Sequence, residues 1–455
     1  MIILTFFIIM AYSGNIKTLY VDPVAADQTV CEFRLPNDIG VYPNLRILHL
    51  GVLRANRDTY SAMAGVYGKI RNISLRSNGQ VIDELRRANA YLAFLNSLKD
   101  NNAQRDQLAT EVKNNSALVV DSQLKTLVGR KTNPTKAVAD GILGRQVALG
   151  YLPLNLCFPV LNEMSHLDTS VFKNLSVRIE YESRIPFTVE ENHNVAFEVA
   201  PNPVLAADQI MDRDVLSKLT SALKGAVWSA VEHDSFIIES QSATADAGAD
   251  DVQVVQTVNR KLVGYNDKYV SRILMIKNGT SAQNNSANAS IGYGEYASKA
   301  QFKESVNFAL NGKNVFSGKG LDNDATKLMI LTDTYGAGAV APFDHLLCCG
   351  LEDQNTATIG ARTILAGDLR TEGKRPLEAN PDGTANSQNQ KTGQYSYIGC
   401  ALESRVKDLQ VDYERTCLKD SQANKPVSGQ LNVNIYAEVR KQLQIMGDKF
   451  LVSYA

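Results

Sequence analysis

Apolar and polar residues alternate along much of the chain, and this alternation predicts short β-strands. It is clearest in residues 176–181 (SVRIEY) and 432–439 (NVNIYAEV). Successive side chains of a strand point to opposite faces of its sheet, so each segment is expected to have one face in a core and one in water. The residues expected to face the core are Val177, Ile179, Tyr181, Val433, Ile435, Ala437 and Val439.

Longer apolar runs predict four more strands, at residues 43–53, 226–238, 269–279 and 327–334. The first run is almost continuously apolar, which is typical of a buried strand. The last two end in the turn-forming pairs Asn-Gly and Asp-Thr. Strands of this kind, separated by turns, indicate antiparallel sheets packed as sandwiches.

Two segments show a helical period instead, at residues 81–98 and 208–225. The second has acidic residues in its first turn and ends in Lys224 and Gly225, as helix termini favour. We expect each helix to cover a sandwich, because its apolar residues form one stripe that does not resemble a cofactor-binding motif. The stripes are Val81, Leu85, Ala88, Leu92 and Leu95 in the first helix, and Met211, Val215, Leu219 and Leu223 in the second.

The order of these segments predicts two similar halves. Polar stretches at 99–145 and 351–395 are expected to be long surface loops at one end of a sandwich. Near residues 190–225 the strands give way to a Pro-containing connector, 201–208, and to the second helix. Strands resume at residue 226, so that each half holds about eight of them, as a jelly roll does.

We therefore predict an all-β fold of two tandem eight-stranded antiparallel jelly rolls, with short helical insertions and long loops. The N-terminal jelly roll is expected to span residues 1–200, of which 1–12 form an extension. The connector helix and the C-terminal jelly roll are expected to span residues 201–455. No internal sequence repeat accompanies this layout, so the duplication is inferred from the order of elements alone.

Charge limits the partners that the chain can bind. Its 455 residues carry 47 basic and 48 acidic side chains, a formal net charge of −1. A protein that coats nucleic acid by electrostatic attraction needs a basic excess or a basic tail. We therefore expect no strong direct binding of nucleic acid.

The first residues, MIILTFFIIM, are apolar at positions 2–10. A signal peptide has Lys or Arg before its apolar run, and none precedes this one. The run is also too short to span a bilayer. We expect neither a signal nor a membrane span here, and Met10 offers an alternative start. A secretory signal or a membrane-active peptide remains the alternative interpretation.

Two glycine-rich segments are weak candidates for binding phosphates. In GKNVFSGKG (312–320) five residues separate the glycines where a phosphate-binding loop has four, and Gly320 stands where Ser or Thr must hold the metal. IGYGEYA (291–297) has Gly292 and Gly294 but no βαβ unit around it. We expect neither segment to bind a cofactor.

Titratable residues give no better candidate site. The six cysteines are scattered and are expected to be reduced, buried thiols: Cys31, Cys157, Cys348, Cys349, Cys400 and Cys417. The histidines lack metal-ligand spacing: His49, His166, His193, His233 and His345. His345 lies near Cys348 and Cys349, but adjacent cysteines rarely bind one ion together.

The run Glu232, His233 and Asp234 could form a catalytic dyad. We expect it instead to be a turn at the start of a strand or a subunit contact. The chain is thus predicted to have no catalytic, cofactor-binding or metal site, and to be no enzyme.

Four segments resemble major capsid proteins of polinton-like viruses, adintoviruses and virophages. Residues 150–181 are similar to the end of the first jelly roll of that family, through Leu152, Pro153, Leu154 and the run Phe172–Leu175. Residues 204–238 resemble its inter-roll connector, with a helix and a Trp-containing strand. Residues 258–276 and 308–336 resemble strands and loops of its second roll.

The resemblance implies a structural protein of an icosahedral DNA virus shell, located in the virion and assembled inside the host cell. It implies a homotrimer whose six rolls form a pseudo-hexagonal capsomer. The implied partners are neighbouring capsomers, penton proteins and minor capsid proteins. Because the charges are interspersed, we expect apolar contacts and backbone pairing to hold the trimer, and contacts between trimers to be more polar.

Two other functions are compatible with jelly rolls. A carbohydrate-binding or carbohydrate-cleaving protein would need aromatic platforms or a carboxylate pair, and the single Trp, Trp228, is expected to be buried. A secreted surface protein would need a signal peptide and disulfides.

Overall fold

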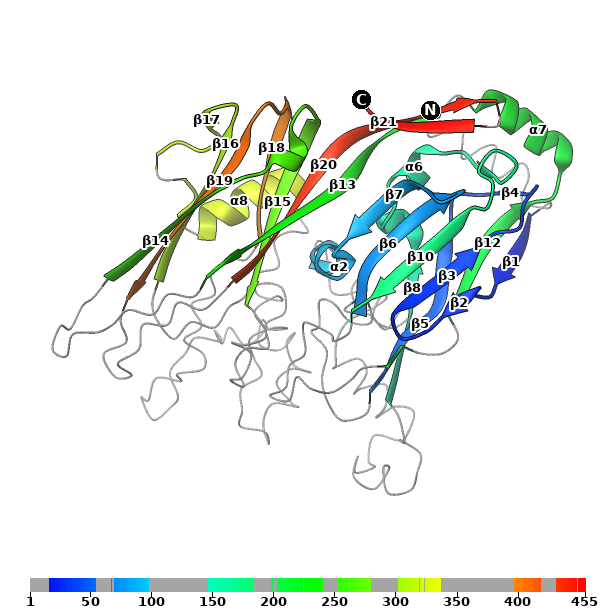
Figure 1. The fold of residues 1–455 in the computed structure, drawn as a ribbon, viewed down its shortest axis with the longest axis horizontal. Helices are drawn as coiled ribbons and strands as arrows, with labels where there is room; N and C mark the ends of the chain where they lie inside the picture. The colour runs from blue at the N-terminus through cyan, green and yellow to red at the C-terminus, as the bar shows by residue number, and fades with distance from the viewer. Residues whose placement is uncertain are drawn as a thin grey trace, which may run out of the picture.

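Two sandwiches of antiparallel sheets lie side by side in the molecule (Figure 1). The fold comes from a computed structural model, and four sheets account for all the strands that it describes. The residues described are 16–54, 67, 69–97, 146–182, 198–199, 203–223, 225–239, 253–279, 302–318, 320–322, 324–336, 397–418, 431–447 and 449–455.

The second half of the chain forms the more regular sandwich. Its sheet III has the strand order β13-β20-β15-β18, and its sheet IV has the order β14-β19-β16-β17. Numbered 1 to 8 along the chain, these strands read 1-8-3-6 and 2-7-4-5, which is the arrangement of a jelly roll. The strands are β13 (Gly225–Ile238), β14 (Gln253–Lys261), β15 (Tyr269–Gly279), β16 (Phe302–Leu310), β17 (Lys313–Asn314), β18 (Tyr397–Arg405), β19 (Leu409–Leu418) and β20 (Leu431–Met446).

The first half has the same topology, built from interrupted strands. In sheet I, β1 pairs with β12, and β12 pairs with β4 and with β5. Strand β4 then pairs with β9, and β5 pairs with β8. Sheet II has the order β3-β10-β6-β7. When an interrupted strand counts once, the orders are again 1-8-3-6 and 2-7-4-5. The strands are β1 (Ile16–Val21), β3 (Val30–Arg34), β4 (Gly40–Val41), β5 (Arg46–Arg54), β6 (Ile70–Ser77), β7 (Gln80–Arg86), β8 (Gln146–Pro153), β9 (Leu167–Asp168), β10 (Ser176–Tyr181), β11 (Glu198–Val199) and β12 (Val204–Ile210), with β2 (Ala25–Ala26) paired to β3.

The two rolls share a detail of turn chemistry. An Asn-Gly pair joins the fourth and fifth strands of each roll, Asn78-Gly79 in the first and Asn311-Gly312 in the second, and all four residues have positive φ. Two-residue hairpins favour this pair because its backbone matches the twist of the strands. A helix follows the fifth strand in each roll, α2 (Ala88–Ser97) and α8 (Asp324–Tyr335). The predicted double jelly roll is therefore confirmed.

Several predicted elements have the expected bounds. The segment 269–279 is β15, 176–181 is β10, and 43–53 contains most of β5. Along β10 the apolar residues Val177, Ile179 and Tyr181 are buried, while Arg178 and Glu180 are partly exposed. The alternation of residue type thus reports which face of this strand meets the core.

The predicted strand at 327–334 is wrong, because these residues belong to α8. Leu331 and Tyr335 lie one helical turn apart and face β18, where a Cβ on Gly399 would lie 3.0 Å from Leu331 Cδ1 and 2.9 Å from Tyr335 Cε2. A short apolar run fits either a buried strand or a buried helix, so its period could not decide between them.

The predicted helix at 81–98 is half wrong. Residues 81–86 belong to strand β7, and only Ala88–Ser97 form the helix α2. The Asn78-Gly79 turn and the pairing of β7 with β6 keep residues 81–86 extended. Val81 and Leu85 therefore lie on a strand, with Val81 exposed and Leu85 buried.

The predicted helix at 208–225 begins later than expected, since α7 spans Arg213–Ala222. Residues 204–210 form β12, which pairs with β1, β4 and β5. The expected connector at 201–208 is thus wrong where it overlaps this strand. The Asp212 carboxylate caps α7 by accepting hydrogen bonds from the N–H groups of Asp214 (2.9 Å) and Val215 (3.1 Å).

Helix α7 lies against the first roll through a small apolar cluster of its own. Tyr42, Ile210 and Val215 are buried there, and Leu216 and Leu219 pack beside them. The approach is close at Gly40, where a Cβ would lie 2.2 Å from Leu216 Cδ1. Glycine at position 40 therefore allows the helix to reach the sheet.

We expect Gly40→Ala to shift α7 away from sheet I and to lower the free energy of unfolding by about 1–3 kcal/mol, as overpacking does. Chemical denaturation with far-UV circular dichroism measures this loss. Gly264→Ala is the matched control, because no atom lies within 4 Å of a Cβ there. Equal stability of the two variants would contradict the close packing.

Candidate functional site

Where the two rolls meet, both faces of strand β20 are buried, whereas the outer face of a single roll would be exposed to water. Sheet III has Ile435, Ala437 and Val439 on one face of β20, yet Asn434, Tyr436 and Glu438 on its other face are also buried. The first roll covers Tyr436 through the Tyr91 ring and the backbone oxygen of Arg87, while Asn434 contacts His233 of β13 and Glu438 contacts Arg272 of β15. We call the contact between the rolls the inter-roll interface; it is formed by β7, α2 and α6 (Val160–Glu163) of the first roll and by β13 and β20 of the second.

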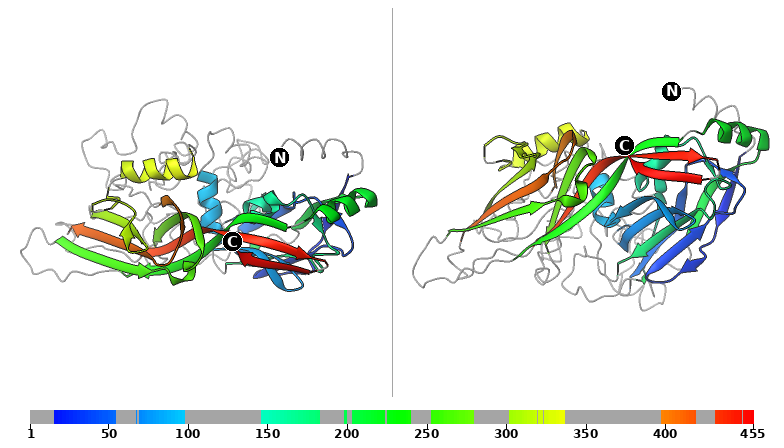
Figure 2. Two further views of the ribbon diagram at one scale, coloured as in Figure 1. Left: turned by 90° about the horizontal axis from the view of Figure 1, so that it is seen from above. Right: turned by 45° about the horizontal axis from the view of Figure 1, so that its top comes forward.

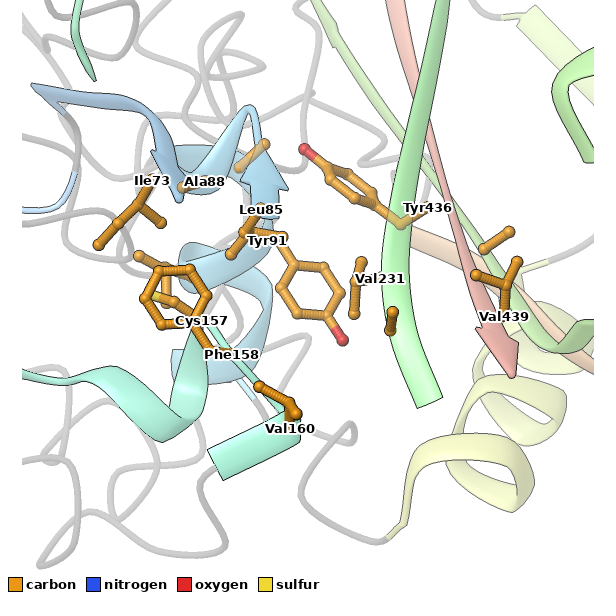
Figure 3. Packing of buried hydrophobic residues seen from close by; sticks show 14 of the residues in the cluster. Ile73, Leu85, Ala88, Tyr91, Cys157, Phe158, Val160, Val231, Tyr436 and Val439 are labelled. Atoms are coloured by element: carbon orange, nitrogen blue, oxygen red, sulfur yellow. The ribbon is translucent and has the colours of Figure 1, made fainter. Parts of the chain in front are cut away.

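Aromatic rings fill the centre of the inter-roll interface (Figure 3). The rings of Tyr91 and Tyr436 lie 5.1 Å apart, and the Tyr436 hydroxyl donates a 2.8 Å hydrogen bond to the backbone oxygen of Arg87. Phe94 meets Tyr335 of α8 edge-on at 5.1 Å. Such pairs add to the gain from burying the rings, so the two rolls are expected to unfold together.

Strands β13 and β20 extend beyond the second roll and reach the first (Figure 1). The C-terminal strand β21 (Lys449–Tyr454) pairs with the far end of β20 and lies with it over the first roll (Figure 2). There the Phe450 ring lies 5.2 Å from that of Phe172. The last strand of the chain is thus part of the contact between the rolls.

A buried carboxyl group lies in the inter-roll interface. Asp83 on β7 is 1% exposed and accepts hydrogen bonds from the N–H groups of Glu84 (3.0 Å) and Val160 (3.4 Å). Burial raises the pKa of Asp83 to about 7, against the opposing effect of the Lys441 ammonium. The nearby indole N–H of Trp228 also lowers the pKa of Asp83. Its Nε1 atom is buried and does not meet the geometric criteria of a hydrogen bond to any group.

Glu232 holds the C-terminal strand to the second roll. Its carboxylate lies 2.6 Å from Lys268 Nζ and 2.9 Å from Lys441 Nζ, and it accepts a 2.6 Å hydrogen bond from the Tyr454 hydroxyl. Burial alone would raise the pKa of Glu232, but Lys441, Lys268 and Tyr454 together lower it. This carboxylate is therefore an anchor for two strands and a loop.

His233 lies beside Glu232 in sequence but points to the other face of β13. Its Nε2 lies 2.9 Å from Asn434 Oδ1 and its ring lies 5.1 Å from that of Tyr436. Burial lowers the pKa of His233 to about 4, so the imidazole is neutral near pH 7. All three residues lie inside β13, so the expected turn at the start of a strand is wrong.

One polar cluster escaped the sequence analysis. His166, Asp168 and Thr220 meet where α7 packs on β9, with Thr220 Oγ1 3.4 Å from His166 Nε2. The Thr220 hydroxyl donates its proton to Asp168 Oδ2 at 2.6 Å, so it is not arranged as a nucleophile in front of a base. Burial would raise the pKa of Asp168, but hydrogen bonds from Ser170 and Thr220 lower it. The cluster attaches α7 to the first roll.

Three of the cysteines are buried, free thiols, which confirms the expectation for Cys31, Cys157 and Cys400. Burial raises the pKa of Cys31 and that of Cys400 to about 12, and it also raises that of Cys157. Thiols with such pKa values stay protonated and are poor nucleophiles. Among the described residues no three His, Cys, Asp or Glu side chains gather as metal ligands would.

The glycine-rich segment 312–320 uses its amide groups internally. Val315 N–H donates to Phe308 O at 2.7 Å, and Phe316 N–H donates to Asn307 Oδ1 at 3.1 Å. A Cβ on Gly320 would lie 2.5 Å from Val306 O, so this glycine allows two backbone segments to approach. The segment is a hairpin turn with its following loop.

Other predictions fall outside the described residues: the N-terminal extension, the loops 99–145 and 351–395, the segment 291–297, His193, His345, Cys348 and Cys349. Cys417 lies on β19. No helix in the described part of the chain has both the length and the apolar character to cross a membrane.

Comparison with known proteins gives likeness in structure without likeness in sequence. Neither a protein-family model nor a curated protein matches the sequence. A chain of the cryo-EM structure of the Sputnik virophage matches with a TM-score of 0.51 and 8% identity, over 96% of this chain and 88% of that one. The crystal structure of the mavirus major capsid protein matches with a TM-score of 0.47 and 9% identity, over 97% and 90% of the two chains.

A third match is the PBCV-1 VP54 crystal structure fitted into a reconstruction of Sputnik, with a TM-score of 0.48, 11% identity and 97% of both chains covered. At these identities the likeness concerns the fold. Strand order and the Sputnik match agree on it: the chain is a double jelly roll of the kind found in the Sputnik virophage structure.

Proposed function

We propose that the chain is the major structural subunit of the capsid of an icosahedral DNA virus. The observation that carries the proposal is the identical strand order of its two rolls, whose buried residues form one continuous hydrophobic cluster. Two equivalent rolls in a chain suit a subunit that repeats around a symmetry axis. The structural likeness to the Sputnik virophage chain supports the same function.

In this proposal three copies form a pseudo-hexagonal capsomer, and the protein resides in the virion. Its partners are further copies of itself, penton proteins and minor capsid proteins. It has no catalytic role. The division into an N-terminal roll (1–200) and a C-terminal part (201–455) also remains a proposal, and the pairing of β12 with β1 supports a boundary slightly later, after residue 210.

The carbohydrate-binding alternative receives no support from the one Trp of the chain. Trp228, the single Trp of the chain, is 3% exposed and packs in the inter-roll interface. A sugar platform needs an exposed ring. The capsid proposal is therefore preferred.

We expect purified protein to form trimers of about 150 kDa, three times the 49.8 kDa chain, and to keep them in about 1 M salt, where the Debye length is only about 3 Å. Apolar contacts and backbone pairing survive such screening, whereas exposed ion pairs do not. Size-exclusion chromatography with light scattering measures the mass, and negative-stain images show the outline. Monomers at low salt would refute the trimer, and dissociation in high salt would refute its apolar character.

A further inference from the structure

The inter-roll interface joins unlike sides of two rolls that have the same strand order. The first roll contributes the side with its fifth strand, β7, and the helix that follows, α2; we call this the helix side of a roll. The second roll contributes the side with its first and eighth strands, β13 and β20; we call this the strand side. At the centre, Tyr91 of α2 packs on Tyr436 of β20, whose cross-strand partner is His233 of β13.

The two corresponding sides that remain lie far apart on different rolls (Figure 1). The second roll has α8 after its fifth strand, β17, just as the first roll has α2 after β7. The first roll has β1 and β12 as its first and eighth strands, just as the second has β13 and β20. Each chain therefore keeps one helix side and one strand side that the inter-roll interface does not use.

The strand side of the first roll exposes an aromatic ring. Tyr20 of β1 is 65% exposed, and its cross-strand partner is Ala206 of β12. Leu205 and Ala207 belong to the main hydrophobic cluster and Ala206 does not, so Tyr20 and Ala206 lie on the face of sheet I that points away from the core. An exposed ring on the outer face of a sheet is suited to a contact between proteins.

A polar network borders the Tyr20 ring. The Asp208 carboxylate of β12 accepts hydrogen bonds from Arg46 (3.1 and 3.2 Å), Asn44 (2.6 Å) and Thr18 (2.7 Å). Thr18 lies two residues from Tyr20 on β1, so both side chains point to the same face. Because the charges of Asp208 and Arg46 are already paired, a second protein can cover them without leaving a lone buried charge. An apolar centre with a polar rim is typical of protein interfaces.

The helix side of the second roll exposes a methionine. Leu331 and Tyr335 of α8 face β18 of their own roll, whereas Met329 is 57% exposed. Methionine side chains are unbranched and adapt to their surroundings, and their sulfur makes favourable contacts with aromatic rings. Met329 is therefore suited to lie against an exposed tyrosine.

We propose that a second copy of the chain occupies the outer face of β1 and β12, with its α8 in the place that α2 takes on β20. Met329 of one copy then lies against Tyr20 of the next. The contact joins unlike surfaces, so each copy carries one of each, and three copies close a ring in which contacts within chains alternate with contacts between chains. This inference rests on the trimer of the proposed function and assigns surfaces to it.

Charged substitutions at the two centres test the contact. Tyr20→Asp and Met329→Asp should each weaken every contact between copies at least about 30-fold, as the loss of a central interface side chain does. On serial dilution, light scattering should show monomers of 49.8 kDa at concentrations where the wild type stays trimeric. Tyr20→Thr, which keeps the strand preference, is the second variant if Tyr20→Asp disturbs β1 in far-UV circular dichroism.

Val255→Asp is the matched control. Val255 is an apolar residue of β14 with 52% exposure, and neither β14 nor its counterpart in the first roll, β3, takes part in the inter-roll interface. This variant should dissociate no more readily than the wild type. If Tyr20→Asp and Met329→Asp behave like Val255→Asp in a protein that is trimeric, the assigned contact is wrong while the proposed function stands. A monomeric wild type would refute the trimer and this contact together.

A mixture of the two variants shows whether the contact joins unlike surfaces. Tyr20→Asp copies keep an intact α8 and Met329→Asp copies keep an intact β1, so one sound contact can form between them. An equimolar mixture should therefore form dimers of about 100 kDa, twice the 49.8 kDa chain, and no closed trimer. Either variant alone, at the same total concentration, should contain fewer dimers. A mixture that associates no more strongly than each variant alone overturns the inference.

Discussion

At pH 8 the Asp83→Asn variant is expected to be more stable than wild type by about 4 kcal/mol. The pKa of Asp83 rises from its ordinary value of 3.8 to about 7 in the folded protein, and each pKa unit corresponds to about 1.4 kcal/mol. A carboxyl group whose pKa is higher in the folded than in the unfolded protein contributes its full stabilisation of the fold only below its pKa in the unfolded protein. That stability is lost as the pH rises through the folded value.

The difference between variant and wild type should therefore vanish near pH 4 and grow between about pH 4 and pH 7. Denaturant unfolding of both proteins at closely spaced pH values measures it. Asp333→Asn, at an exposed carboxylate, serves as the control and should show no such growth. A difference independent of pH would mean that Asp83 is not buried as a neutral acid.

Replacing Tyr436 by Ala should cost about 3–5 kcal/mol, the usual range for deleting a buried aromatic side chain. Tyr436 is 1% exposed and packs on Tyr91 and His233 across the inter-roll interface. Its hydroxyl also satisfies the backbone oxygen of Arg87. Because the ring joins the rolls, we further expect thermal unfolding to split into two transitions.

Differential scanning calorimetry distinguishes these outcomes. Tyr436→Phe keeps the ring and should cost only about 1 kcal/mol, the net value of one hydrogen bond, with a single transition. A single transition in Tyr436→Ala would show that the rolls remain coupled without this ring. A loss as small as that of Tyr436→Phe would show that the ring is not tightly packed.

The sequence by itself determined several strands of the sheets, among them β10 and β15. Apolar and polar residues alternate in β10, and the apolar run of β15 has the length of a strand. Both features are local properties of residue order, because successive side chains of a strand point to opposite faces. The number and spacing of such segments predicted the two jelly rolls. The capsid interpretation came from four segments that resemble major capsid proteins. The Asn-Gly turns were also visible, and they could have identified β7 as a strand.

Tertiary structure decided whatever depends on two surfaces meeting. The run 327–334 forms a helix that packs on β18, where Gly399 leaves room for Leu331 and Tyr335. Tyr436 of β20 alternates with the apolar core residues of that strand and is buried because the first roll covers it, and no period within β20 carries that information. In the same way Asp83 appears in the sequence as an ordinary polar residue of an amphipathic segment. Its carboxyl is buried, and its pKa raised, because α6 of the first roll and strands β13 and β20 of the second lie against it, and these elements are far along the chain, at distances that local alternation does not encode.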